Sequence, residues 1–131
     1  MSETPPNSNE LAVERTLMAA TRTLQAWIRT ALSMLSFGFT IAKIFQYLRE
    51  SGAVAGDWRP VGPTNLGLAL IVLGTALLMA ATVEHILFVK RLQANAPHDV
   101  PRHSIAVTAA IIVVLIGVTL IGNLLLQVGP F

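Results

Sequence analysis

Cysteine is absent from this sequence, and charged side chains are scarce: only 12% of the 131 residues are Asp, Glu, Lys or Arg. Without cysteine the chain has no disulfide, no thiol nucleophile and no cysteine-based metal site. So little charge beside 53% hydrophobic residues excludes an ordinary soluble domain, whose surface needs more polar area. The formal net charge of +2 is a mild basic excess, and we expect no nucleic-acid partner.

Signals for catalysis are also absent. The sequence has no glycine-rich phosphate loop, no nucleophile and base at a meaningful spacing, and no paired carboxylates, so we expect neither an enzyme nor a cofactor. His98, Asp99 and His103 are of metal-ligating types, but they lie in a proline-rich loop without the i, i+4 spacing of a helical site. We expect solvated loop residues there and no metal site.

Three apolar stretches reach the roughly 20 residues that a membrane-spanning helix needs. We predict spans over residues 31–48, 66–89 and 104–128. A disordered tail is expected over residues 1–8, and the spans belong to one domain over residues 9–131. The sequence therefore predicts an all-α membrane protein with three transmembrane helices.

An amphipathic basic helix is predicted over residues 9–30, directly before the first span. Asn7 and Glu10 have the spacing of a capping box at its start. No proline and only one glycine, Gly38, follow before the end of the first span. The helix therefore either continues into the span or bends near Arg29, where its basic part meets its apolar part.

An Arg-Thr pair recurs every seven residues in this basic helix, at Arg15, Arg22 and Arg29. Because seven residues make almost two helical turns, the three arginines stack on one face, about 10.5 Å apart. Further polar residues extend this face into the span. The whole polar stripe comprises Arg15, Arg22, Arg29, Ser33, Ser36, Thr40 and Lys43.

Charges at membrane depth normally face the interior of a bundle or a wet cavity. Several copies of the stripe around a shared axis would form stacked basic rings, which is the usual electrostatics of an anion pathway.

A purely structural interpretation of the same residues stays open. Residues 10–30 can lie in the membrane interface with their arginines on lipid phosphates. Lys43 can extend its amine to the membrane surface. The hydroxyl residues of the stripe can permit close helix packing, as can Gly38 and Ala42 at small-xxx-small spacing.

Glu84 is the one carboxylate inside a predicted span. We predict an ion pair between Glu84 and Arg29 that serves structure, because both residues lie near the same membrane edge. A proton relay with His85 is the alternative for this carboxylate.

The distribution of Lys and Arg predicts the orientation in the membrane. Six of them flank the side that holds the N-terminus and the 90–103 loop, whereas only Arg49 and Arg59 flank the other side. We therefore expect a cytoplasmic N-terminus and an external C-terminus, and we predict a bacterial inner membrane as the location. No cleavable signal peptide is expected, because residues 1–10 are polar.

Residues 14–48 closely resemble the YidH-type family of small membrane proteins, whereas the later spans match that family only in hydropathy and length. The resemblance rests on Arg22-Thr23, Ala26-Trp27, Arg29-Thr30, Phe37-Gly38-Phe39 and Lys43. A related domain forms the membrane part of the eukaryotic vacuolar transporter chaperone, a polyphosphate polymerase, where the first helices of a ring of three-helix subunits line a basic pore. The resemblance implies a homo-oligomer, a pentamer-like ring, with Arg22 and also Arg29 lining its pore. It implies no polymer synthesis, because nothing in this sequence resembles the polymerase domain.

We therefore expect a homo-oligomeric membrane channel or pore component for anions, such as a phosphate-type anion, with the polar stripe along its axis. The alternative is a non-conducting scaffold in the lipid bilayer that binds anionic lipid or a partner protein through the arginine-rich helix.

Overall fold

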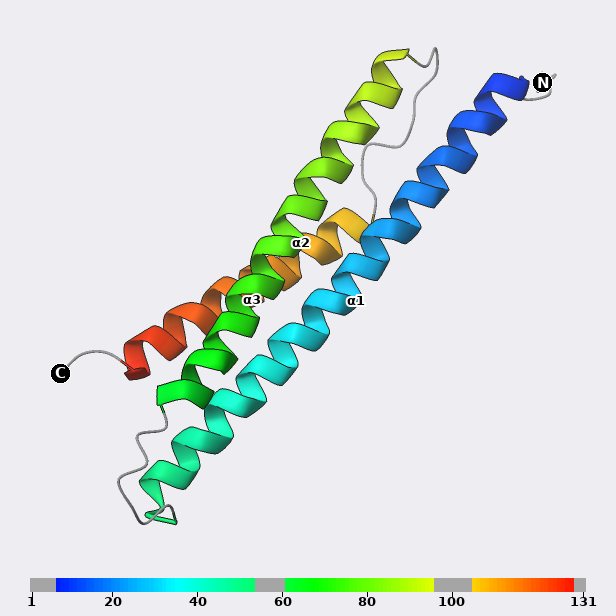
Figure 1. Ribbon diagram of the computed structural model, residues 1–131. Coiled ribbons are helices and arrows are strands. Elements are labelled where there is room, and N and C mark those ends of the chain that lie inside the picture. Colours follow the sequence, from blue (N-terminus) through cyan, green and yellow to red (C-terminus); the bar gives the residue numbers. More distant parts are fainter. Residues whose placement is uncertain (1–6, 54–60, 96–104, 129–131) are drawn as a thin grey trace.

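The computed structural model describes residues 7–53, 61–95 and 105–128. These residues form three helices and no strand (Figure 1). The helices are α1 (Ser8–Glu50), α2 (Val61–Asn95) and α3 (Ile105–Val128). Each is long and apolar enough to cross a membrane, which confirms the predicted all-α fold with three spans. The chain is an integral membrane protein.

Helix α1 is one continuous helix of 43 residues. The predicted capping box starts it: the backbone N–H of Asn7 donates to Oε2 of Glu10 at 3.1 Å. The helix ends before Gly52, whose φ of 66° only glycine adopts readily. At 1.5 Å per residue α1 is about 64 Å long, roughly twice the hydrocarbon thickness of a bilayer. The bend considered near Arg29 does not occur. Of the tail predicted over residues 1–8, residues 1–6 lie outside the described residues, whereas Asn7 caps α1 and Ser8 is its first residue.

Helix α2 is longer at both ends than the predicted span 66–89. It begins at Val61, because the first turn of a helix tolerates Pro63, which has no N–H to leave unsatisfied. It also continues past Val89, the last residue of the predicted span, through Lys90, Arg91 and further good helix formers to Asn95. Helix α3 matches the span predicted over 104–128, although Ser104, the first residue of that span, lies outside the described residues.

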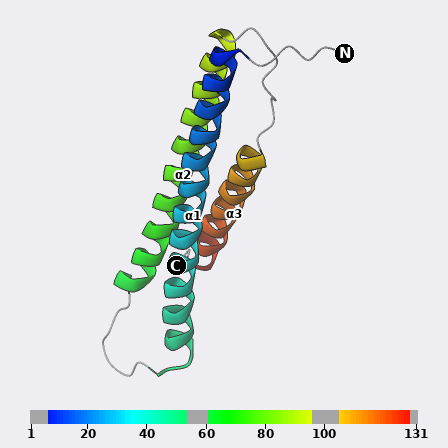
Figure 2. The ribbon, with the colours of Figure 1, turned by 90° about the vertical axis from the view of Figure 1, so that its right-hand side faces the viewer.

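Helices α1 and α2 lie antiparallel and side by side, and the shorter α3 packs obliquely against them (Figures 1 and 2). Two contacts fix the register of the long pair: Gly38 faces Gly67, and His85 hydrogen-bonds to the backbone of Ala20. At the end that holds the N-terminus, both long helices extend beyond α3, as both views show. The molecule is thus a long two-helix hairpin with a third helix beside its lower part.

Small residues permit the close helix contacts. A Cβ atom on Gly38 would lie 2.5 Å from the carbonyl oxygen of Gly67, and one on Gly67 would lie 3.0 Å from Cβ of Ala42. This confirms the close packing predicted for Gly38 and Ala42. A side chain at Gly117 would collide with Thr75, so α3 packs against α2 through the same kind of close contact. The buried apolar cluster comprises Leu24, Ala31, Leu35, Ala42, Ile71, Leu78, Ala106, Ala110, Val113 and Leu124.

Candidate functional site

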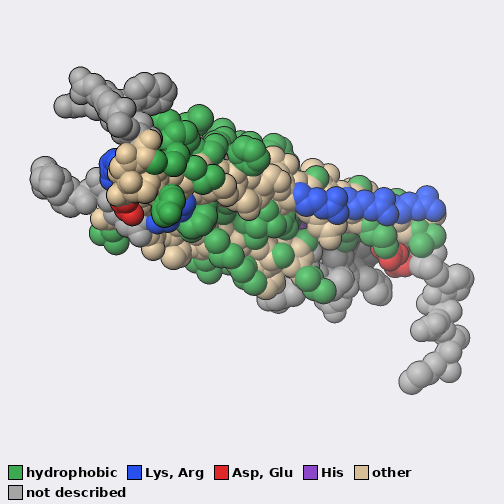
Figure 3. Space-filling view, turned by 90° about the horizontal axis from the view of Figure 1, so that it is seen from below, with side chains coloured by type: hydrophobic (Ala, Val, Ile, Leu, Met, Phe, Trp, Pro, Cys, Tyr) green, Lys and Arg blue, Asp and Glu red, His purple; other side chains and the backbone are tan. Residues whose placement is uncertain are grey.

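The three arginines of the stripe lie exposed on the outer face of α1. The buried residues of that helix, among them Leu24 and Ala31, lie on the opposite face, against α2 and α3. The arginines therefore point away from the rest of their own chain, as their spacing predicted. A line of basic side chains runs along one edge of the molecule (Figure 3).

The arginine row continues the predicted span 31–48 along the same unbroken helix. Arg29 adjoins the apolar stretch that begins at Ala31, and Arg22 and Arg15 follow about 10 and 21 Å further along the axis. Because α1 is unbroken, its N-terminal half cannot lie flat in the membrane interface while its other half spans the bilayer. The interfacial arrangement considered for residues 10–30 would need a bend that this helix does not have.

Each threonine of the Arg-Thr pairs bonds to its own helix. The hydroxyls of Thr16, Thr23 and Thr30 donate to carbonyl oxygens four residues earlier, at 2.8, 3.1 and 3.1 Å. Each acceptor belongs to an alanine, so the repeat is Ala-x-x-Arg-Thr. Sequence reasoning missed the alanines, although they recur at the same seven-residue interval. The bonded hydroxyls cost little in an apolar setting, because their donors are already satisfied.

Within the spanning half of α1, Ser33, Ser36 and Thr40 continue the exposed face. Oγ of Ser33 donates to the carbonyl oxygen of Arg29 at 3.0 Å, and Oγ1 of Thr40 donates to that of Ser36 at 2.8 Å. The structure therefore brings the predicted stripe together on one outer surface from Arg15 to Thr40.

Lys43 lies at the edge of this surface and is less exposed than the other residues of the stripe. Its side chain is partly buried, and its Nζ atom donates to Oε1 of Gln46 at 3.2 Å. Nζ also lies 5.9 Å from the centre of the Phe39 ring, within reach of a cation–π interaction. Contacts along its own helix thus hold this amine at the edge of the stripe.

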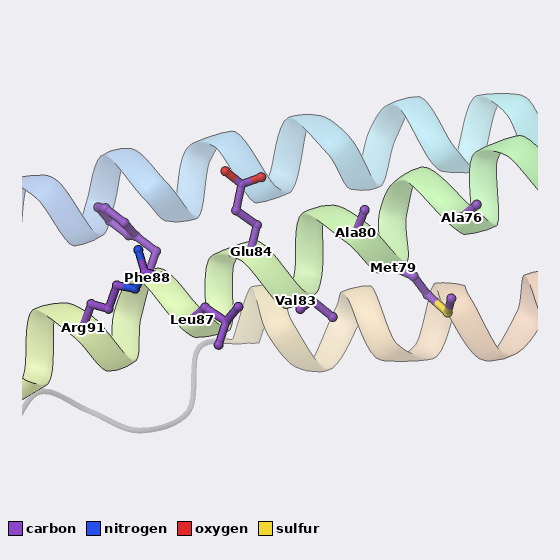
Figure 4. Close-up of a pocket in the computed structure, with 8 residues that line it drawn as sticks. All are labelled: Ala76, Met79, Ala80, Val83, Glu84, Leu87, Phe88 and Arg91. Carbon is purple, nitrogen blue, oxygen red and sulfur yellow. The ribbon is translucent and has the colours of Figure 1, made fainter.

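Glu84 lies on the outer face of α2, in an open groove of about 630 Å³ (Figure 4). Residues of α2 alone line it: Ala76, Met79, Ala80, Val83, Glu84, Leu87, Phe88 and Arg91. The His85–Ala20 contact places Glu84 level with Thr21, eight residues or about 12 Å from Arg29 along the axis. Side chains lean toward the N-terminus of their own helix, so on antiparallel helices these two lean toward one another along the axis. Their ion pair stays a prediction.

His85 lies on the other side of α2, buried between the two long helices. Its hydrogen bond to the backbone of Ala20 ties the C-terminal part of α2 to the N-terminal part of α1. Because Glu84 is exposed and His85 is buried, these neighbours point to different sides, and the geometry gives no support to a relay between them.

Comparison with known proteins gives a family match that covers these features. A domain of unknown function, DUF202, matches residues 15–91, more than half of the sequence. The chain belongs to this family. DUF202 proteins are the YidH-type small membrane proteins that the sequence resembles. No curated protein and no solved structure matches the chain.

The DUF202 match runs from Arg15, the first arginine of the row, to Arg91 at the polar end of the α2 groove. It thus covers the α1–α2 hairpin and leaves α3 outside. Within the described parts of this DUF202 chain, no three His, Asp or Glu side chains gather as a metal site would require. The residues considered as ligands, His98, Asp99 and His103, lie outside those parts.

Proposed function

We propose that this DUF202 protein assembles with further copies of itself in the membrane and forms a channel or pore component for anions. The first helix of each copy would face the shared axis, with the stripe lining the pathway. Its lining would comprise Arg15, Arg22, Arg29, Ser33, Ser36 and Thr40, with Lys43 at its edge. One observation carries the proposal: this polar face is exposed along α1, opposite the face that packs in the chain's own core.

A single chain in lipid leaves this face without a suitable neighbour. Ser33, Ser36 and Thr40 would face acyl chains, and Arg29 would lie at the hydrocarbon edge. Polar and charged groups at membrane depth usually face a bundle interior or water. Around a common axis, the same residues would instead meet water and permeating ions, and the stacked arginines would attract anions and repel cations. The resemblance to the pore-forming domain of the vacuolar transporter chaperone supports a ring, a pentamer-like one.

The second candidate is a non-conducting scaffold. Arg15 and Arg22 lie exposed on the part of α1 that extends beyond the apolar stretch. This position also suits a row of cations that binds anionic lipid headgroups or an acidic partner protein. Both functions use the same arginines, but only the first moves ions.

Ion flux in proteoliposomes separates the two candidates. If α1 lines a pathway, the wild-type protein passes anions in preference to cations, and Arg22→Glu abolishes or reverses this preference while the oligomer keeps its mass. Lys90→Glu is the matched control, because it makes the same change of charge on α2, away from the stripe. A wild-type protein that passes no anion at any potential would exclude the channel, and the scaffold would then be the remaining candidate. Arg22→Glu would then only weaken binding to anionic vesicles, by about 1 kcal/mol per lost positive charge.

A further inference from the structure

The stripe changes chemistry at the membrane edge. From Arg15 to Arg29 it presents guanidinium groups, which are hydrogen-bond donors only. Between Arg29 and Lys43 its exposed side chains include only hydroxyls, those of Ser33, Ser36 and Thr40. An anion on this path thus leaves a donor-rich region and enters one where hydroxyls set the selectivity.

Two of these hydroxyl groups already donate a hydrogen bond to a backbone carbonyl of their own helix. Oγ of Ser33 donates to Arg29 and Oγ1 of Thr40 donates to Ser36, at 3.0 and 2.8 Å. A hydroxyl has one hydrogen but two lone pairs, so each of these oxygens is left as an acceptor toward the outside. The two oxygens lie seven residues apart, about 10.5 Å, on the same exposed face.

We infer that the spanning part of the stripe selects oxyanions that carry their own O–H group, with Ser33 and Thr40 as the specificity-determining residues. This inference rests on the proposed anion pathway. A hydroxyl-bearing oxyanion such as dihydrogen phosphate donates first to one of Ser33 and Thr40 and then, further along the path, to the other. At each position its remaining oxygens accept from arginine or from the hydroxyl of Ser36. An anion without a hydrogen atom must instead make Ser33 or Thr40 give up its helix bond, or pass those positions without a protein hydrogen bond.

Dihydrogen phosphate and perchlorate make a matched pair of probes, because both are tetrahedral and singly charged but only the first carries O–H groups. The reversal potential, with one anion on each side of a planar bilayer, gives their permeability ratio. It is measured at a pH low enough to keep inorganic phosphate in its dihydrogen form. We expect the wild-type protein to favour dihydrogen phosphate. Ser33→Ala with Thr40→Val should lower this preference about tenfold, the size expected from two lost hydrogen bonds.

Thr30→Val is the control variant. Its hydroxyl makes the same kind of bond, to Ala26 at 3.1 Å, but lies outside the stripe, so the permeability ratio should stay unchanged. A protein that conducts both anions equally, or a double variant with the wild-type ratio, would overturn the inference and leave the pathway standing. A protein that conducts neither anion would overturn the pathway and the inference together.

Discussion

Gly38 and Gly67 face each other across the contact between α1 and α2, and each leaves room for the backbone of the other. A Cβ atom on either residue would lie 2.5 Å from the carbonyl oxygen of its partner. A backbone oxygen cannot move aside as the end of a flexible side chain can. This contact therefore sets the spacing and the register of the hairpin.

Replacing Gly38 with alanine should force the two long helices apart. Overpacking of a tight contact typically costs about 1–3 kcal/mol, so Gly38→Ala should lower the midpoint of thermal unfolding in detergent. Gly122→Ala is the control, since nothing lies within 4 Å of a Cβ atom there and alanine favours helix over glycine. Equal midpoints for Gly38→Ala and the wild-type protein would show that the helices do not touch at this point.

The bond between His85 and Ala20 should stabilise the part of the hairpin that lies beyond α3. His85→Leu keeps an apolar body but removes the bond, at a cost of about 0.5–1.5 kcal/mol. We expect faster hydrogen exchange in α1 around Ala20. Thr82→Val should change little, because the buried hydroxyl of Thr82 bonds within its own helix, to Leu78 at 2.7 Å. Unchanged exchange around Ala20 in the His85 variant would argue against the contact.

The ion pair predicted between Glu84 and Arg29 is open to a double-mutant cycle. If the pair forms, Glu84→Ala and Arg29→Ala should each lower stability in detergent, and the double variant should lose less than the sum. A second cycle, with Glu84→Ala and Arg15→Ala, is the control. Along the axis Arg15 lies on the opposite side of Glu84 from Arg29, and its side chain leans away from Glu84. The stability losses of these two variants should therefore add within about 0.5 kcal/mol. Additive losses in both cycles would exclude the pair.

The orientation predicted from the Lys and Arg distribution can be tested with single cysteines, because the natural sequence contains none. A cysteine that replaces Gly129 should react with an impermeant thiol reagent added outside intact cells. One that replaces Ser8, the first residue of α1, should react only after the cells are opened. The reverse pattern would place the arginine row on the external side.

Much of the fold is readable from the sequence, because hydropathy and length reveal spans directly. The 3.6-residue period also predicts which face of α1 carries Arg22 and which carries Leu24, since both follow from one helix alone. The ends of α2 are less readable. Pro63 and Lys90 are ordinary signals for a helix boundary, yet a first turn tolerates proline and a helix can project from the membrane past a basic pair.

The register between helices could not be predicted from the sequence. It depends on which small residue of α1 meets which small residue of α2. The candidates are one glycine and several alanines on α1, and several glycines and alanines on α2. In the structure Gly38 meets Gly67, and this contact determines the position of Glu84 along the helix axis relative to the arginines. The contacts of Lys43 with Gln46 and Phe39 could not be predicted either, because they depend on side-chain conformations.

The unbroken course of α1 has a mechanical consequence. Arg15, outside the apolar stretch, and Thr40, inside it, belong to one rod and lie 25 residues or about 38 Å apart. A helix without a proline or a kink has no point at which its two halves can bend separately. Because Gly38 and Gly67 also hold α1 tightly against α2, a tilt imposed at the outer arginines would displace Ser33 and Thr40 together with the hairpin.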